Sequence, residues 1–421
     1  MMAAYWTKRQ LLQGASLAGA MAMAYAPAAL AQRATAGRAG ASKGDSIARV
    51  TAFPVVVPCR LQVGSYDRDI RMGGTVVEVE TGDGLTGIGF TSITNSEIVA
   101  AAVNLVAAPA LKGVDSINRE AVAAQLHHLL TPRGQTGHAQ HAISAIDIAL
   151  WDILGKRLDM PVWRLLGGAR SSVPSYTTFG MAYMSRDELA AAAGHLARAG
   201  RQRLKMVVAA GAHDRIAKGE SIEQIMAEDV ERIRAVREAA GPEVELYIDG
   251  NHGLDGYQTR RFIKRIEEFD IAFFEEPVSG NDVTRLSDLR KTSPIAIAAG
   301  QNETHLRRFR DFIISQAVDV LQFNTCMCGG YTAALKVAGL AAAFGMEIDN
   351  GGGYAEYNMH LHAGLANGGM VEWHLGSAAL GPVLYKDYPA LDGDRLPLPE
   401  APGLGFSVNM DVVREHTIGG R

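Results

Sequence analysis

Short apolar runs alternate with helical patterns along the second half of the chain. The runs are typical of buried strands, and the segments between them carry apolar residues at three- and four-residue spacing, as helices do. The predicted strands are 173–179, 203–208, 244–249, 271–275, 295–299, 318–323, 346–349 and 370–373. Eight strands alternating with helices favour a closed parallel barrel over an open doubly wound sheet. A glycine-rich phosphate fingerprint does not follow the first strand, which argues against dinucleotide binding.

A different pattern precedes this predicted barrel, which spans 171–375. The signals are strands at 48–57 and 75–80, a turn at 82–84, and helices within 95–130 and 139–156. Together they predict an α+β domain over 46–170, of ordinary domain size. The last segment, 376–421, is rich in Pro and Gly and is expected to pack back onto the N-terminal domain.

The first residues are typical of an export leader. Lys8 and Arg9 precede an Ala-rich apolar run, and Ala29-Leu30-Ala31 is a small-x-small cleavage pattern. The cation pair is similar to a twin-arginine signal, so we expect residues 1–31 to direct export, most simply to the periplasm. Residues 32–45 are expected to form a disordered spacer, and the protein is not expected to stay bound to a membrane after leader cleavage.

Composition narrows the class of protein. Of the 421 residues, 48% are hydrophobic and 20% are charged, which is typical of a globular chain and excludes disorder and a multispan membrane protein. The net charge is −4, and basic residues do not cluster with aromatic ones, so nucleic acid is not an expected partner. Three cysteines cannot form a disulfide framework, and Cys326 and Cys328 are expected to be buried in packing.

Candidate metal ligands stand at three successive strand ends. Asp249 ends the third barrel strand, Glu275 ends the fourth, and Gln301 follows the fifth. Because residues at the carboxyl ends of barrel strands line the active site, the three oxygen-bearing side chains can converge on one hard cation. Oxygen ligation with open positions suits Mg²⁺.

The chain resembles a known protein family over nearly all of its length after the leader. The motifs that carry the resemblance are Ala145–Lys156 with Pro161, Leu165-Leu166-Gly167-Gly168, Ile248-Asp249-Gly250-Asn251, Phe274-Glu275-Glu276-Pro277, Ala298-Ala299-Gly300-Gln301-Asn302, Gly329-Gly330 and Pro402-Gly403-Leu404-Gly405. They are similar to those of the enolase superfamily, in its mandelate racemase and muconate lactonizing enzyme branch.

The resemblance implies a fold and a chemistry. The fold is a modified TIM barrel of the α/β class with an N-terminal α+β domain as its cap. The chemistry is Mg²⁺-assisted abstraction of the proton α to a substrate carboxylate, since a cation on the carboxylate makes the enediolate accessible. A small carboxylate as substrate and a homo-oligomeric assembly are further expectations from the family.

The chain departs from the family at one ligand and at the base. Family members usually carry Glu where Gln301 stands, and Glu303 is a nearby oxygen donor that can compensate. The second strand usually ends in Lys-x-Lys with the second Lys as base, whereas here only Lys205 remains, or Arg203 and Lys205 form the pair if the register shifts by two. Lys205 is expected to point into the barrel, where it serves as a base with a lowered pKa beside the cation or contacts the substrate carboxylate.

The opposite face lacks the usual His–Asp dyad. Asn324 and, approximately, Gly351 stand at the two positions of the dyad in the racemase branch. The candidate replacements are His252, Tyr354, Glu356 and His360. Glu372 matches an acid that hydrogen-bonds the developing enediolate in the family, and His374 shares its strand face.

The remaining candidates are substrate contacts. Asn251, Asn302, Glu303 and Asn324 stand in or beside the strand-end motifs. Residues 60–73 are expected to form a polar, mildly cationic loop that closes the barrel mouth and sets specificity. Its expected contacts are Tyr66, Arg68, Arg71 and Met72.

Three functions remain open. The first is a Mg²⁺-dependent lyase that removes an α-proton and expels a β-leaving group, such as a dehydratase of sugar acids, for which one base is enough. The second is an epimerase, racemase or cycloisomerase, which needs a proton donor on the other face. The third is a non-catalytic barrel that binds a small anion.

Overall fold

The computed structural model describes residues 44–130, 136–209 and 211–419. The expected export leader, 1–31, and the expected spacer as far as residue 43 lie outside these ranges. Across the described helices, none is both long and apolar enough to cross a membrane.

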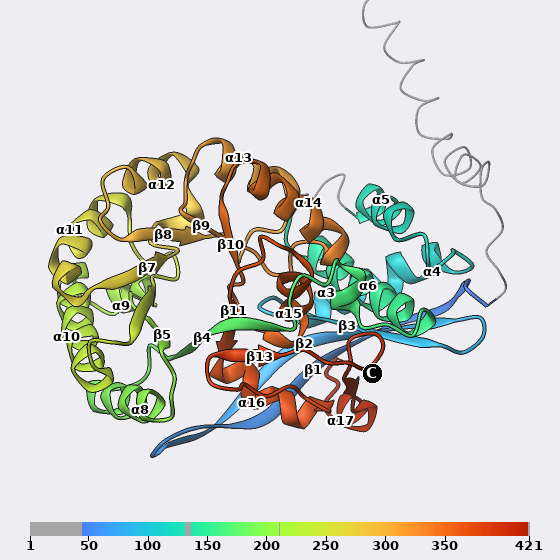
Figure 1. The fold of residues 1–421 in the computed structure, drawn as a ribbon, viewed down its shortest axis with the longest axis horizontal. Coiled ribbons are helices and arrows are strands. Elements are labelled where there is room, and N and C mark those ends of the chain that lie inside the picture. Colours follow the sequence, from blue (N-terminus) through green and yellow to red (C-terminus); the bar gives the residue numbers. More distant parts are fainter. Residues whose placement is uncertain (1–43, 131–135, 210, 420–421) are drawn as a thin grey trace, which may run out of the picture.

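A parallel barrel forms the larger part of the structure (Figure 1). Its strands are β4 (Ser172–Gly180), β5 (Arg203–Val207), β6 (Glu245–Asp249), β7 (Ile271–Glu275), β8 (Ala296–Ala299), β9 (Val320–Gln322), β10 (Glu347–Asp349) and β11 (Val371–His374). They follow one another in order from β4 to β10, and β11 lies on the other side of β4. A parallel bridge between Ile348 and Gly368 links β10 to the segment before β11, so the barrel is nearly closed. Each of the eight predicted strands is present, and the predicted barrel is confirmed.

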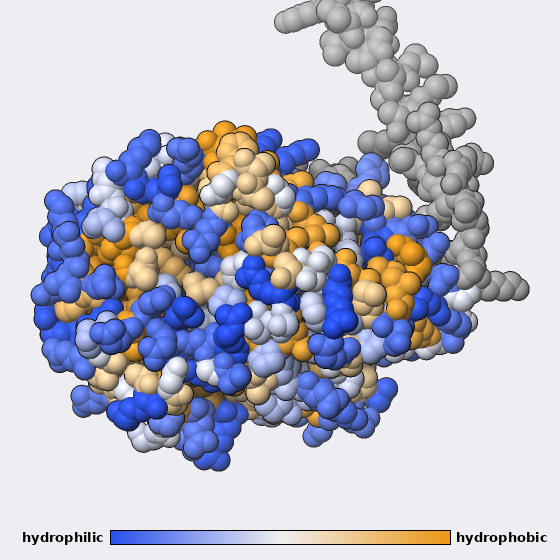
Figure 2. All heavy atoms as spheres, viewed as in Figure 1, coloured by the Kyte–Doolittle hydropathy of each residue, from blue (hydrophilic) through white to orange (hydrophobic). Residues whose placement is uncertain are grey.

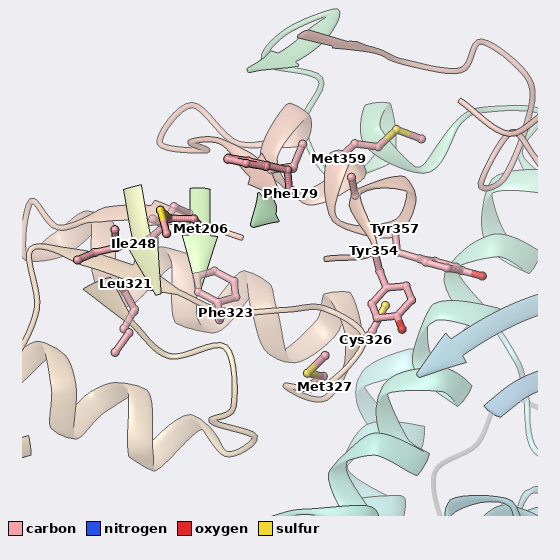
Figure 3. Packing of buried hydrophobic residues seen from close by; sticks show 14 of the residues in the cluster. Phe179, Met206, Ile248, Leu321, Phe323, Cys326, Met327, Tyr354, Tyr357 and Met359 are labelled. Carbon is pink, nitrogen blue, oxygen red and sulfur yellow. The ribbon is translucent and has the colours of Figure 1, made fainter. Parts of the chain in front are cut away.

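Helices surround the barrel on its outer side. They are α8 (Arg186–Arg198), α9 (Ala212–Ala217), α10 (Ile222–Ala240), α11 (Gly256–Ile266), α12 (Val283–Arg290), α13 (Leu306–Ile314), α14 (Gly330–Ala343) and α15 (Ala355–Gly364), with short 3₁₀ turns η2 (Glu267–Phe269) and η3 (Ser279–Asn281). Met206, Ile248 and Leu321, each next to a buried polar strand residue, belong to the apolar cluster shown in Figure 3. This alternation leaves polar side chains for the barrel interior. The outer surface over the barrel helices is mostly hydrophilic (Figure 2).

The cap consists of an antiparallel sheet with helices on one side. Its elements are β1 (Ile47–Val63), β2 (Tyr66–Thr81), β3 (Thr86–Thr91), α3 (Ser96–Ala101), the π-helix η1 (Ala102–Ala107), α4 (Ala108–Leu111), α5 (Arg119–Leu130), α6 (His138–Arg157) and α7 (Val162–Leu165). Helix α6 is buried on all sides from Gln140 to Gly155, which explains its nearly continuous apolar sequence. A Cβ on Gly89 would lie 1.8 Å from the carbonyl oxygen of Ala145, so only glycine lets α6 approach β3 this closely.

The expected lid loop is not a loop. Strands β1 and β2 continue through residues 60–73 as a two-stranded ribbon, with Val63 paired to Tyr66 and Met72 paired to Val57. Cys59, Leu61 and Val63 are buried and alternate with polar neighbours, which is the period-two pattern of a strand. The ribbon tip reaches α8, where a Cβ on Gly64 would lie 3.2 Å from the ring of His195.

The C-terminal segment joins the two parts of the molecule. It contains α16 (Leu375–Leu384), β12 (Tyr385–Lys386), β13 (Arg395–Pro397), β14 (Ser407–Val408) and α17 (Met410–Glu415). Strand β13 pairs with β4 of the barrel, and β12 pairs with β14. The amide of Ile418 donates to the carbonyl of Pro54 at 2.8 Å, so the end of the described chain lies against β1 of the cap.

Candidate active site

Three strand ends bring the expected metal ligands together. Asp249 is the last residue of β6 and is in register with Glu275, the last residue of β7. Gln301 follows β8 by two residues, and all three side chains are buried. The sequence-based prediction that these residues share one end of the barrel agrees with this placement.

Lys205 lies in the middle of this group. Its side chain is fully buried, and its ammonium nitrogen lies 2.9 Å from Glu372 Oε1 and 3.7 Å from Asp249 Oδ2. It also donates a short hydrogen bond to Glu275. Burial lowers the pKa of Lys205, but the charges of these three carboxylates raise it well above the usual value. The carboxylates that enclose the amine therefore oppose the lowered pKa that we expected for Lys205 beside a bound cation.

The carboxylates of the cluster respond differently to burial. Burial raises the pKa of Asp249 to about 6 and raises the pKa of Glu275 well above its usual value. Burial also acts to raise the pKa of Glu372, but nearby Lys205 outweighs it and the pKa is lowered. Glu372 is further held by the backbone amide of Gly353, which donates to Oε2 at 2.7 Å. Three carboxylates face one ammonium group, so the cluster carries surplus negative charge and suits a cation.

The side-chain oxygens also fit a hard cation geometrically. Glu275 Oε1 is buried and has no hydrogen-bond partner in the described structure. A Cβ on Gly351 would lie 3.0 Å from Glu275 Oε1 and 3.2 Å from Gln301 Oε1, so these two oxygens border the same small space. Within the described ranges, no three His, Cys, Asp or Glu side chains form a metal-binding set. The expected set contains only two residues of those types, because its third member is an amide.

Glu276 orients the amide of Gln301. Its buried carboxylate accepts hydrogen bonds from Gln301 Nε2 at 3.1 Å and from Asn302 Nδ2 at 2.8 Å. His252 Nε2 lies 2.9 Å from the same carboxylate. Burial lowers the pKa of His252, but the hydrogen bond and charge of Glu276 raise it overall. His252 therefore lies beside the ligand residues and not across the barrel, where a replacement for the dyad would stand.

A cavity of about 380 Å³ opens above this cluster. Most of the expected strand-end residues line it, namely Asp249, Asn251, Gln301, Asn302, Tyr354 and Glu372, and so does Met72 from the cap. Thr178, His374 and Ser377 add further polar groups. Thr178 and Ser377 were not among our expectations, although the rule that active sites lie at strand ends points to Thr178 near the end of β4.

Three expected substrate contacts serve other purposes. Arg203 lies at the amino end of β5 and pairs with Glu245 at 3.3 Å, so the two-residue register shift does not bring it to the site. Glu303 pairs with Arg308 at 2.9 Å and is not among the described residues that line the cavity, which favours Gln301 as the third oxygen donor. Asn324 donates to the carbonyl of Gly351 at 2.7 Å and thereby holds the loop after β10.

The cap residues near the mouth differ from the polar lid we expected. Arg68 is paired with Glu188 of α8 at 3.6 Å and does not line the cavity. Tyr66 is buried in the ribbon tip, 5.4 Å below the guanidinium of Arg68. Of the expected lid contacts, Met72 of β2 lines the cavity, and Ile93, which follows β3 and was not expected, lies there with it. The cap therefore presents apolar side chains to the site.

The other second-face candidates, Tyr354, Glu356 and His360, are buried. Tyr354 lines it, but its hydroxyl donates to Ser92 Oγ of the cap at 2.6 Å, and burial raises its pKa. Figure 3 shows Tyr354 beside Cys326, and Cys326 and Cys328 are both buried, as predicted. His360 is fully buried, and burial lowers its pKa to about 3. Neither Tyr354 nor His360 is free to carry a proton into the cavity.

Glu356 is expected to make stability depend on pH. It is 1% exposed, and burial raises its pKa to about 8, far above the value of about 4.3 for an unfolded chain. Between these values the folded state binds more protons, so stability falls as pH rises. We expect Glu356→Gln to remove this fall. The free energy of unfolding of the variant should exceed that of the parent by up to about 1.4 kcal/mol more for each pH unit between 5 and 8. Urea unfolding at pH 5, 6.5 and 8 measures this difference in stability.

The matched control for this prediction is Glu243→Gln. Glu243 is an exposed residue just before β6, so its replacement should leave the parent pH dependence unchanged. An equal gain in stability at pH 5 and pH 8 for Glu356→Gln would contradict the interpretation.

Two family profiles and several known proteins match this chain in sequence. A family profile described as "Mandelate racemase / muconate lactonizing enzyme, N-terminal domain" matches residues 48–167, and one described as "Enolase C-terminal domain-like" matches 188–412. L-rhamnonate dehydratase of Saccharopolyspora erythraea is 31% identical over 81% of this chain and 84% of its own length. The 3,6-anhydro-alpha-L-galactonate cycloisomerase of Streptomyces coelicolor is 28% identical over 88% of this chain and 99% of its own length.

A solved structure is similar over the same extent. A racemase from Streptomyces coelicolor A3(2), crystallised with bound magnesium, matches with a TM-score of 0.78 and 26% identity, over 88% of this chain and 100% of the racemase chain. The similar proteins thus include a dehydratase, a cycloisomerase and a racemase.

Proposed function

The chain belongs to the mandelate racemase and muconate lactonizing enzyme family of the enolase superfamily, and from this membership we propose that it is a Mg²⁺-dependent dehydratase of a sugar acid or related hydroxy acid. The observation that carries the proposal is the convergence of Asp249, Glu275 and Gln301 beneath a cavity that Glu372 also lines. The similar proteins include dehydratases, cycloisomerases and a racemase, and the choice of elimination for this chain is our own.

Asp249, Glu275 and Gln301 would hold the cation. Glu275 Oε1 and Gln301 Oε1 border one space, and Asp249 Oδ1 accepts only the backbone amide of Asn251, at 2.9 Å. When bound, Mg²⁺ supplies positive charge that stabilises the enediolate formed after loss of the α-proton.

Lys205 is the base in this proposal. As metal ligands, Asp249 and Glu275 would share their charge, so two of the three ion pairs that now raise the pKa of Lys205 would weaken. Glu372 stays paired to Lys205 at 2.9 Å and borders the cavity, where it can accept a hydrogen bond from the enediolate. The amine would take the α-proton at its nitrogen.

Elimination fits the opposite face better than epimerisation. An epimerase needs a second proton carrier, and the family position for it is held by Gly351, whose loop is fixed by Asn324. Among the candidates in the described chain, Tyr354 is bonded to the cap and His252 lies beside the ligands. Elimination needs only one base, and in this proposal Lys205 is that base.

The test has two stages. Calorimetric titration of Mg²⁺ into metal-free protein is expected to show one site, and no binding at millimolar concentration would reject a metal-dependent enzyme. The loaded protein is then incubated with a panel of sugar acids and aromatic hydroxy acids in deuterated water. We expect a dehydrated keto acid, whereas deuterium in unchanged or inverted substrate without elimination would favour an epimerase.

Gln301→Glu is expected to strengthen Mg²⁺ binding about tenfold or more, because ligand charge tunes the affinity of oxygen sites. The same variant should be less stable without metal, since the new carboxylate would face Glu276, to which Gln301 Nε2 now donates at 3.1 Å. Calorimetry and urea unfolding in chelator measure the two effects.

Glu303→Gln is the control for this prediction. Glu303 is paired with Arg308, so its replacement should leave the Mg²⁺ affinity unchanged. Loss of affinity in Glu303→Gln with no gain in Gln301→Glu would assign the third ligand to Glu303 instead.

A further inference from the structure

The cavity has one polar end and one apolar end. The polar end is the ligand cluster described above, with Glu372 beside it. The apolar end is formed by Met72 and Ile93 from the cap and by Met181 and Tyr183 from the barrel mouth, whereas the apolar Val207 lies in register with Asp249. A substrate whose carboxylate lies over the ligand cluster therefore extends the rest of its chain toward apolar side chains.

Cationic side chains are missing from this wall. Among the described residues that line the cavity there is no Lys or Arg, whereas Asp249 and Glu372 contribute two carboxylates. The nearby Arg68 is engaged with Glu188 outside the cavity, and Lys205 is enclosed by its three carboxylates. A second carboxylate on the substrate would find no cationic partner among the described residues of this wall, and the carboxylates of Asp249 and Glu372 would repel it.

His374 is the only histidine among the described residues that line the cavity, and the protein fixes its tautomer. Its Nδ1 accepts the backbone amides of Gly376 at 3.1 Å and Ser377 at 3.4 Å, because His374 is the N-cap of α16. A ring nitrogen that accepts these bonds carries no proton, so the ring is neutral and the proton is on Nε2. Burial lowers the pKa of His374, in agreement with a neutral ring.

The free side of that ring faces the cavity. No described residue accepts a hydrogen bond from Nε2, and the ring itself lines the cavity beside Met72. A neutral N–H is a suitable donor to a hydroxyl oxygen, and it offers a distal carboxylate no compensating charge.

From these two observations we infer that the cavity selects monocarboxylates whose remaining chain is uncharged and bears a hydroxyl group, and that His374 Nε2 donates a hydrogen bond to that hydroxyl. The inference rests on the proposed function, which places the reacting carboxylate at the metal ligands. Dicarboxylic sugar acids are disfavoured because none of the described residues that line the cavity is a Lys or Arg, and His374 is a binding residue that does not exchange a proton.

The first experiment compares matched acids with the full chain loaded with Mg²⁺. Galactonate and galactarate, and gluconate and glucarate, differ only in a terminal hydroxymethyl or carboxylate group. Calorimetry is expected to show at least one monoacid bound about 100-fold more tightly than its diacid. Equal or tighter binding of the diacids, or no monoacid binding while Mg²⁺ binds, would overturn the inference. Failure of Mg²⁺ itself to bind would instead reject the proposed function.

The second experiment uses variants of the wall. Met72→Lys supplies the missing cation and is expected to improve diacid affinity at least tenfold. His374→Asn keeps an oxygen that can cap α16 but lacks the Nε2 donor. It should bind the hydroxy acid about tenfold more weakly, bind the corresponding deoxy acid as the parent does, and unfold at the parent temperature. Equal weakening for both acids would assign His374 a structural role only.

Discussion

Replacement of Lys205 by Met is expected to lower the free energy of unfolding by about 3–5 kcal/mol, which is the usual effect of removing one partner from a buried ion-pair cluster. Lys205 is fully buried, and its ammonium group is the cation shared by Asp249, Glu275 and Glu372. Without it, three buried carboxylates repel one another in a region of low dielectric. Urea unfolding at pH 7.5 in the presence of chelator measures the loss.

Arg203→Met provides the matched control on the same strand face. Arg203 is two residues away, but its side chain is 30% exposed and its partner Glu245 is 51% exposed. Its replacement should cost less than about 1 kcal/mol, as for other exposed pairs. Mg²⁺ should restore more stability to Lys205→Met than to the parent, because the cation would neutralise the same carboxylates. A loss in Lys205→Met no larger than that in Arg203→Met would contradict the proposed cluster.

The alternation of strands and helices made the barrel predictable. Each strand of a parallel barrel is buried on both faces, so it appears as an apolar run, and the helices between carry a clear period. The ribbon of the cap was harder to predict, because only one of its faces is buried and the strands continue past the apolar segments. The alternation of Leu61 and Val63 with polar residues was the available signal.

Strand ends could be predicted from sequence, but the direction of side chains beyond them could not. Asp249 and Glu275 are the last residues of regular strands, so the barrel determines where they point. Gln301 and Glu303 stand in a loop, and their roles are decided by two partners far along the chain or in the next helix, Glu276 and Arg308. In the same way, the carboxylates around Lys205 come from three different strands, and only the folded barrel shows that they enclose it.

The replacement of Asp249 by Asn is expected to separate function from stability within this same cluster. The isosteric amide can keep its acceptor for the backbone amide of Asn251, now 2.9 Å away, but it loses the ligand charge. We expect Mg²⁺ binding to disappear from calorimetry at millimolar concentration and kcat/KM to fall by at least about 10²–10³-fold. Stability in chelator should be equal to or above that of the parent. Burial raises the pKa of Asp249 to about 6, so the carboxylate that predominates at pH 7.5 lowers the stability of the folded state, and the neutral amide removes this cost. The control is Asp319→Asn. Asp319 pairs with Arg290 ahead of β9, at the other end of the barrel strands. Its replacement should therefore leave Mg²⁺ affinity and turnover unchanged. Lys205→Met and Asp249→Asn thus have opposite effects on stability although their side chains lie 3.7 Å apart, and a large stability loss in both would mean that Asp249 is structural and not a metal ligand.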